Sequence, residues 1–203
     1  RPFHKLVHGR KSNRLYLEHV PAEFRNPPPL SIPEHSCDNI HKRKWLEQIA
    51  ALQPDLILSV CTHVIFKPRL FEIPRYGLFM LHEGLTPEYR GLHTAAWPLI
   101  NGEPEMSGWT LLRIDKGIDS GPILCQGRYP QPELFGMCWG VLGHVALLHG
   151  LAEMKEALDN LCRNDGLFEP VSQEGRVSRN YSWVPLTTYL RQRQKRRRRE
   201  SRS

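Results

Sequence analysis

GLFMLHEGLTPEYRG, residues 77–91, combines a strand pattern with the loop that follows it. Its apolar run, Leu78–His82, has the length and composition of a strand buried in a sheet. His82 stands where this strand runs into the loop. In the loop, Pro87 stiffens the backbone and Gly91 lets the chain enter the next helix. Because ligands of open α/β sheets bind outside the carboxyl ends of the strands, the position of His82 predicts a functional site there.

Helix and strand patterns alternate on both sides of this stretch. Upstream, apolar residues at helical spacing predict a helix over 39–53. A short apolar run at 56–60 then predicts a strand buried on both faces, and one or two helical turns are expected within 66–72. Downstream, the patterns predict a helix at 94–101, strands at 109–114 and 123–129, and one long amphipathic helix at 135–162. This alternation indicates an α/β fold.

A second loop carries the other candidate for chemistry. Between the two downstream strands the chain reads DKGIDSGP, residues 115–122, where two glycines and a proline require a turn. The turn places Asp119 at a loop tip at the strand ends. A histidine and a carboxylate that meet across a cleft can share proton transfer, because imidazole titrates near neutral pH and the carboxylate can orient it. A lone histidine at a strand end is more often structural, so the residues alone leave both roles open.

These two loops lie in blocks that resemble a known family. Residues 77–91 are similar to the pattern Gly-x-x-Asn-x-His, a short loop, then Leu-x-Pro-x-Tyr/Trp-Arg-Gly of the formyltransferases that use 10-formyltetrahydrofolate. Residues 107–124, SGWTLLRIDKGIDSGPIL, are similar to the same family's threonine-containing strand and its Asp-x-Gly-x-Asp-Thr/Ser-Gly segment. A weaker third similarity is QPDLILSV, residues 53–60. Methionyl-tRNA, glycinamide ribonucleotide and sugar N-formyltransferases share these features.

The resemblance implies a Rossmann-like fold with an open, mostly parallel sheet, in which an amine attacks the formyl carbon of the folate. His82 matches the family's histidine, so it would polarise the formyl oxygen or stabilise the oxyanion. Asp119 matches the family's aspartate, so it would orient His82 and help to remove the amine proton. Met80 stands where the family has an asparagine. A thioether cannot donate a hydrogen bond, and loss of one oxyanion donor typically costs about 10²- to 10³-fold in rate.

The resemblance also implies which residues bind the two substrates. The donor's pterin would lie between the loop after the first matched strand and the loop before Asp119; the residues expected to bind it are Leu58, Val60, Ile65, Ile114, Asp115, Gly117 and Ile118. The acceptor is expected to contact Gly84, Tyr89 and Arg90, the last through its forked cation. His144 and His149 are five residues apart and do not make the i, i+4 pair of a zinc helix, so no metal is expected.

The formal charge of +7 is located at one end of the chain. Residues 191–203, RQRQKRRRRESRS, hold eight Arg or Lys and one Glu, so the rest of the chain is neutral. This tail has no apolar residue and is predicted to be disordered, with nucleic-acid contact expected only through it. The predicted divisions are a partial N-terminal segment with a Pro-rich connection at 1–36, a catalytic core at 37–170, a C-terminal segment at 171–190 and the basic tail. The family's first strand–helix unit is expected to be missing or divergent.

The cysteines and the hydropathy of the chain indicate in which cellular environment it is expected. The five cysteines form no CxxC pair, which argues against a zinc site or a disulfide framework and favours a reducing, cytoplasmic location. Cys61 and Cys125 are interpreted as structural thiols, because no neighbouring base would activate them. No apolar run approaches the roughly 20 residues of a membrane span.

Three hypotheses of different classes remain open. The preferred one is transfer of a formyl group from 10-formyltetrahydrofolate to an amine of a small metabolite, an amino sugar or a sugar nucleotide. Methionyl-tRNA is disfavoured, because a separate tRNA-binding domain would not fit after residue 162. The second hypothesis, motivated by Met80, is a weakened or inactive relative that binds folate or a sugar nucleotide. The third is a basic-tail nucleic-acid adaptor. Apolar residues of the terminal segment are also compatible with a homodimer.

Overall fold

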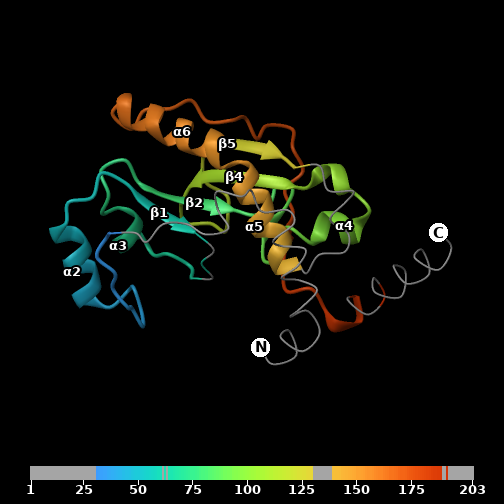
Figure 1. Ribbon diagram of the computed structural model, residues 1–203, viewed down its shortest axis with the longest axis horizontal. Helices are drawn as coiled ribbons and strands as arrows, with labels where there is room; N and C mark the ends of the chain where they lie inside the picture. Colours follow the sequence, from blue (N-terminus) through green and yellow to red (C-terminus); the bar gives the residue numbers. More distant parts are fainter. Residues whose placement is uncertain (1–30, 61, 63, 130–138, 189–190, 192–203) are drawn as a thin grey trace.

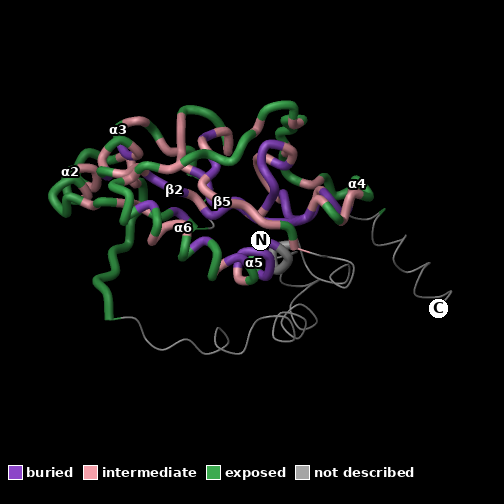
Figure 2. The backbone as a smooth tube through the Cα atoms, turned by 90° about the horizontal axis from the view of Figure 1, so that it is seen from above, coloured by how far each residue is buried: buried purple, intermediate pink, exposed green. Residues whose placement is uncertain are grey.

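The computed structural model describes residues 31–60, 62, 64–129, 139–188 and 191 (Figure 1). Its main sheet has four strands in the order β1-β2-β4-β5. These strands are β1 (Ile57–Val60), β2 (Leu78–His82), β4 (Gly108–Arg113) and β5 (Ile123–Arg128). The helices α5 (Trp139–His149) and α6 (Leu151–Arg163) lie across one face of this sheet (Figures 1 and 2). The α/β prediction is thus confirmed.

The sheet is mixed, so the prediction of a mostly parallel sheet is wrong. Only β1 and β2 run parallel, whereas β2 pairs with β4 and β4 pairs with β5 in the antiparallel sense. The physical reason lies in the connection between β4 and β5. It comprises only residues 114–122, whereas a parallel pair would need a crossover of a dozen or more residues.

Strand β1 is less buried than its apolar composition predicts. Among its residues only Ser59 is buried, while the side chains of Leu58 and Val60 are largely exposed. In the described part of the sheet β1 has a neighbour on one side only. The expectation of a strand buried on both faces is therefore not met there.

The shorter helices lie within their predicted ranges. They are α2 (Arg43–Ala51), α3 (Pro68–Phe71) and α4 (Trp97–Asn101), followed by the 3-10 turn η2 (Pro104–Met106). In α3 and α4 a proline stands in the first turn, where its missing N–H leaves no intrahelical bond unmade. None of the described helices is long and apolar enough to cross a membrane.

The prediction of one long helix over 135–162 is wrong. Gly150 separates α5 from α6, and residues 135–138 lie outside the described part of the chain. A Cβ atom at position 150 would lie 2.0 Å from the indole ring of Trp109. The break therefore brings the chain close to the sheet at a point where only glycine fits.

The main core lies between the sheet and the α5–α6 layer. Its buried members are Phe79, Leu81, Trp109, Leu111, Leu147, Met154 and Leu161. Because successive side chains of a strand point to opposite faces, Phe79 and Leu81 face this core while Met80 and His82 face the other side of β2. Packing of one face thus positions the candidate residues on the other.

Residues 171–184 of the predicted C-terminal segment (171–190) return along the sheet to the loop after β2. Val171 donates its N–H to the Ile123 carbonyl at 3.0 Å, and Arg179 donates to the Pro87 carbonyl at 3.0 Å. Its strand β6 (Asn180–Tyr181) then pairs in parallel with β3 (Arg90–Gly91). A Cβ atom at Gly91, whose φ is 97°, would lie 2.1 Å from the Tyr181 carbonyl oxygen, so the pairing requires glycine.

Candidate active site

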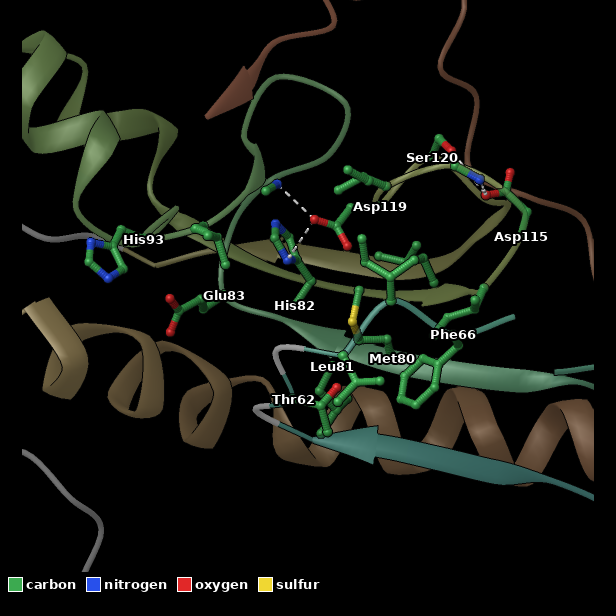
Figure 3. Close-up of a pocket in the computed structure, with 18 of the residues that line it drawn as sticks. Thr62, Phe66, Met80, Leu81, His82, Glu83, His93, Asp115, Asp119 and Ser120 are labelled. Carbon is green, nitrogen blue, oxygen red and sulfur yellow. Dashed lines mark hydrogen bonds and ion pairs between the residues drawn. The ribbon is translucent and has the colours of Figure 1, made fainter. Parts of the chain in front are cut away.

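A pocket of about 400 Å³ lies at the carboxyl end of β2 (Figure 3). Its walls include parts of β2, the loop between β4 and β5, the loop after β1 and α5. Its size falls within the range of sites that hold small molecules. The pocket therefore occupies the place that the strand-end argument predicted.

His82 is the last residue of β2 and is buried. Its Nε2 lies 2.8 Å from the backbone oxygen of Tyr89. Because a carbonyl can only accept, this bond requires a proton on Nε2. The other nitrogen, Nδ1, lies 3.6 Å from Oδ2 of Asp119, within ion-pair range but beyond an ordinary hydrogen bond. The ring is therefore fixed with Nδ1 toward the carboxylate (Figure 3).

Asp119, in the block of residues 107–124, contacts His82 and Gly91 of the block of residues 77–91. Its φ of 48° is left-handed, a conformation that Asp and Asn adopt more readily than most residues. Its Oδ2 accepts a hydrogen bond of 2.7 Å from the N–H of Gly91, and its side chain is only 10% exposed. A carboxylate held in this way beside an imidazole can stabilise the charge of the imidazolium.

The rest of the turn after β4 is held by its own hydrogen bonds. Asp115 Oδ1 accepts from the N–H of Gly117 at 2.8 Å and from the hydroxyl of Ser120 at 3.0 Å. This Asx-type turn fixes the backbone between Ile114 and Asp119. It thereby sets two isoleucines, Ile114 and Ile118, along the pocket wall.

Met80 lies on the pocket side of β2, with its thioether toward the cavity (Figure 3). Its neighbours in the lining include Phe66, Leu112 and Ile114. This wall is apolar, and Met80 supplies no hydrogen-bond donor to it.

The structure divides the predicted donor-binding residues. Ile65, Ile114, Asp115, Gly117 and Ile118 line the pocket together with Met80, His82 and Asp119. Leu58 and Val60 do not; they lie on the exposed strand β1. The loop after β1 reaches the pocket instead through Thr62, Val64 and Phe66.

The three predicted acceptor-binding residues lie outside the pocket lining. Gly84 packs on Thr94, where a Cβ atom would approach to 2.8 Å. Tyr89 is fully buried, with its ring stacked on Tyr181 at 5.1 Å between centroids. Arg90 belongs to β3, and its Nε is buried with no partner among the described residues. Gly84 and Tyr89 thus pack within the protein, and contact of these three residues with an acceptor stays a prediction.

A polar network anchors Tyr89 from behind. Its hydroxyl donates to Glu103, which also accepts from Arg179 at 3.2 Å. Burial, followed by the bond to Glu103, raises the pKa of Tyr89. The bond from Tyr89 lowers the pKa of Glu103 below its ordinary value. The network stabilises the backbone whose carbonyl accepts from His82.

Several lining residues were not predicted. They include Glu83, Leu92, His93 and Ser120, with His144 and Leu147 from α5. Glu83 directly follows His82, so its place at a strand end was a signal that the sequence offered. The contribution of α5 was not visible, because it depends on how that helix packs.

The remaining candidates carry less chemistry. Burial raises the pKa of Cys125 to about 11, so its thiol stays protonated at neutral pH, in line with a structural role. Cys61, His63, most of residues 1–36 and nearly all of the basic tail lie outside the described residues. Among the described residues no cluster of three or more metal-ligating side chains occurs.

Comparison with known proteins identifies the family. The profile described as "Formyl transferase" matches residues 16–131, more than half of the chain. The chain belongs to the formyl transferase family. The match contains both sequence blocks and therefore both His82 and Asp119.

Two curated relatives are similar in sequence. A methionyl-tRNA formyltransferase of Trichlorobacter lovleyi is 38% identical over 111 residues, which are 51% of this chain and 35% of that protein. The bifunctional polymyxin resistance protein ArnA of Wigglesworthia glossinidia brevipalpis is 42% identical over 95 residues, which are 47% of this chain and 14% of ArnA. The chain thus spans about a third or less of the length of these relatives.

Two solved structures are similar in fold. WlaRD, a sugar 3N-formyl transferase crystallised in the presence of dTDP and 5-N-formyl-THF, superposes with a TM-score of 0.52 at 28% identity, over 66% of this chain and 47% of WlaRD. HypX from Aquifex aeolicus, in complex with tetrahydrofolic acid, gives a TM-score of 0.57 at 22% identity, over 72% of this chain and 27% of HypX. The fold is that of the formyltransferases, with a mixed sheet.

Proposed function

We propose that this chain carries the site of a formyl transfer from 10-formyltetrahydrofolate to a primary amine of a small metabolite. The observation that carries the proposal is the pair His82–Asp119, which two separate family blocks bring together in one pocket at a strand end. A structural histidine would not need a cavity beside it. The presence of 5-N-formyl-THF in the WlaRD crystals supports a folate donor.

The donor is proposed to lie along the wall formed by the turn after β4. Ile65, Ile114 and Ile118 offer apolar surface to a flat ring, and the turn's backbone offers polar groups. The donor supplies an activated formyl group, whose carbon is attacked by the amine. In this arrangement the formyl carbon would lie near His82.

His82 and Asp119 have distinct proposed roles. With Nε2 committed to the Tyr89 carbonyl, Nδ1 is the nitrogen that can donate to the formyl oxygen when the ring is charged. Asp119, with Oδ2 3.6 Å from Nδ1, lies within ion-pair range of that ring. As negative charge develops on the oxygen, the imidazolium stabilises it, and the effect is strong because His82 is buried and largely shielded from water.

A second candidate function is supported by Met80. A weakened relative, which binds the donor but turns over slowly or not at all, would keep the pocket and lose an oxyanion donor. Met80 lies in the pocket where an asparagine is expected from the family pattern, and it cannot take over that hydrogen bond.

The test begins with calorimetric titration of the full chain with 5-formyltetrahydrofolate, a stable analogue of the donor. Saturable binding at one site is expected, and a folded chain that binds none would overturn both candidate functions. Mass spectrometry of amines incubated with 10-formyltetrahydrofolate then detects transfer. Met80→Asn should raise the rate by about 10²- to 10³-fold, the value of one oxyanion donor, whereas Met80→Leu should leave it unchanged. Equal rates for the two variants would argue against the proposed position of the formyl oxygen.

A further inference from the structure

The pocket holds a carboxylate that the mechanism above does not use. Glu83 follows His82 in the chain and lines the same pocket. In Figure 3 its side chain extends to the side of β2 opposite Asp119, toward the helix beneath, while His93 lies beyond it. Glu83 and Asp119 thus lie on two sides of the β2 terminus, with His82 between them.

Helix α5 is shaped to accommodate this carboxylate. A Cβ atom at the buried Gly143 would lie 1.7 Å from Oε2 of Glu83 and 2.6 Å from its Cδ. Any other residue at position 143 would displace the carboxylate. Gly143 therefore leaves the space in which the Glu83 carboxylate lies against α5 at the end of β2.

The charges of the pocket select for a cation. Three carboxylates line it, those of Glu83, Asp115 and Asp119, and no lysine or arginine does so among the residues the structure describes. Glu83 is the carboxylate on the side away from the proposed donor wall, where His93 and His144 also line the cavity.

We infer that Glu83 binds the ammonium group of the acceptor, and that the acceptor is a small cationic amine with no phosphate close to that amine. A phosphate there would meet three carboxylates and, in the described lining, no lysine or arginine to offset them. The inference rests on the proposed formyl transfer and narrows its acceptor. The inference favours an unphosphorylated amino sugar over a phosphorylated amino sugar as the acceptor.

Glu83 also has a role in the transfer step. The ammonium gives one proton to the Glu83 carboxylate, and its freed electron pair forms the new C–N bond to the formyl carbon. The electron pair of the carbonyl bond moves to the formyl oxygen, beside His82. When it returns, the bond from carbon to N10 of the folate breaks, N10 gains the second proton of the amine, and Glu83 releases its proton to solvent. The products are a formamide and tetrahydrofolate.

The experiment compares matched acceptors on matched variants. Glucosamine and ethanolamine are each tested beside glucosamine 6-phosphate and phosphoethanolamine. Transfer is followed by mass spectrometry, and amine binding to the chain saturated with 5-formyltetrahydrofolate is followed by calorimetry. We expect the unphosphorylated amines to be preferred at least about 10-fold. Glu83→Gln should lower their kcat/KM, or their affinity where turnover is slow, by about 10-fold or more. Donor affinity should stay within about twofold.

Two further variants test whether an effect of Glu83→Gln comes from the Glu83 carboxylate itself or from a change in net charge. Glu105→Gln removes an exposed carboxylate outside the pocket and should change nothing. Gly143→Ala should reproduce the loss by displacing the Glu83 side chain. An unaltered Glu83→Gln variant, a preference for the phosphorylated amines, or no binding of either unphosphorylated amine would overturn the inference. The proposed function would still stand if the donor binds, because donor affinity is measured separately.

Discussion

The two walls of the pocket are built in different ways. The wall after β4 is local, since Asp115 closes it through hydrogen bonds to Gly117 and Ser120, two and five residues away. The wall from Glu83 to His93 depends on remote parts of the chain. The N–H of Val184 lies 3.4 Å from Nδ1 of His93, 91 residues away.

The C-terminal segment carries most of this remote support. Its Tyr181 ring stacks on Tyr89 at 5.1 Å and on Trp97 at 4.9 Å, and its Trp183 contacts His93 edge-on at 4.5 Å. The turn after β4 takes one hydrogen bond from this segment, from Gln173 to the Gly121 carbonyl at 3.2 Å, whereas the wall from Glu83 to His93, the proposed acceptor wall, takes several contacts from it. We therefore expect changes to that segment to alter acceptor binding more than donor binding.

The largest expected effect comes from Asp119, which lies in the turn after β4 beside His82. Asp119→Asn keeps the acceptor for the Gly91 N–H and tolerates the left-handed backbone, but it removes the charge beside His82. The rate of formyl transfer should fall by about 10²- to 10⁴-fold, the usual range for loss of a group that supports proton transfer. Steady-state kinetics measures this, with donor affinity as a second readout.

Asp115→Asn is the matched control for this variant. It removes a carboxylate from the same turn, but one that accepts from Gly117 and Ser120 and makes no contact with His82 in the structure. We expect it to raise the KM for the donor and to leave kcat within a few-fold. A similar loss of kcat in both variants would mean that the turn, and not the charge beside His82, controls the rate.

A smaller effect should follow when the C-terminal segment is loosened. Arg176 makes a bidentate pair with Glu88, at 2.8 and 2.6 Å, and bonds Gln126 at 2.8 Å. Arg176→Ala leaves Glu88, 15% exposed, without this partner, at a cost of about 2 kcal/mol. For a chain of this size, that loss of stability corresponds to a fall of about 4 to 8 °C in Tm. Acceptor KM should rise more than donor Kd.

Arg75→Ala provides the surface counterpart. Arg75 also bonds a carboxylate, that of Asp165 at 2.6 Å, but the two side chains are 60% and 69% exposed. Exposed ion pairs contribute about 0 to 1 kcal/mol, so the unfolding free energy should hardly change. Equal destabilisation by the two substitutions would show that the C-terminal segment does not depend on its half-buried pair.

The difference between the walls also explains what the sequence could predict. Local patterns and the family resemblance predict the strand Leu78–His82 and the turn that carries Asp119. They also predict that His82 and Asp119 lie close together. Local signals were sufficient because the turn's glycines and proline allow few conformations. The roles of individual pocket residues remain predictions.

Features set by distant packing could not be predicted in the same way. Tyr89 and Gly84 were expected to face a ligand, yet they pack on Tyr181 and Thr94, and nothing in the loop's own sequence encodes those partners. The sense of the sheet likewise depends on how β4 returns beside β2. Gly150 does not by itself indicate a break, because a glycine inside a helical pattern is costly but tolerated.

The smallest effect concerns the network behind the acceptor wall. The hydrogen bond from Tyr89, and then that from Arg179, holds the pKa of Glu103 below its ordinary value of 4.5. A carboxyl with a depressed pKa in the folded state stabilises the fold above its ordinary pKa, and this contribution is lost as the pH falls through the folded value. The chain should therefore lose thermal stability between about pH 5 and pH 3, and the Glu103→Gln variant should lose less over that interval.

Thermal unfolding at each pH measures this difference, with Glu105→Gln as the exposed control. Other carboxyls with depressed pKa values, such as Asp38 and Asp159, act equally in all three proteins and cancel in the comparison. If Glu103→Gln and Glu105→Gln show the same dependence on pH, the contact of Glu103 with Tyr89 does not contribute to docking of the acceptor wall.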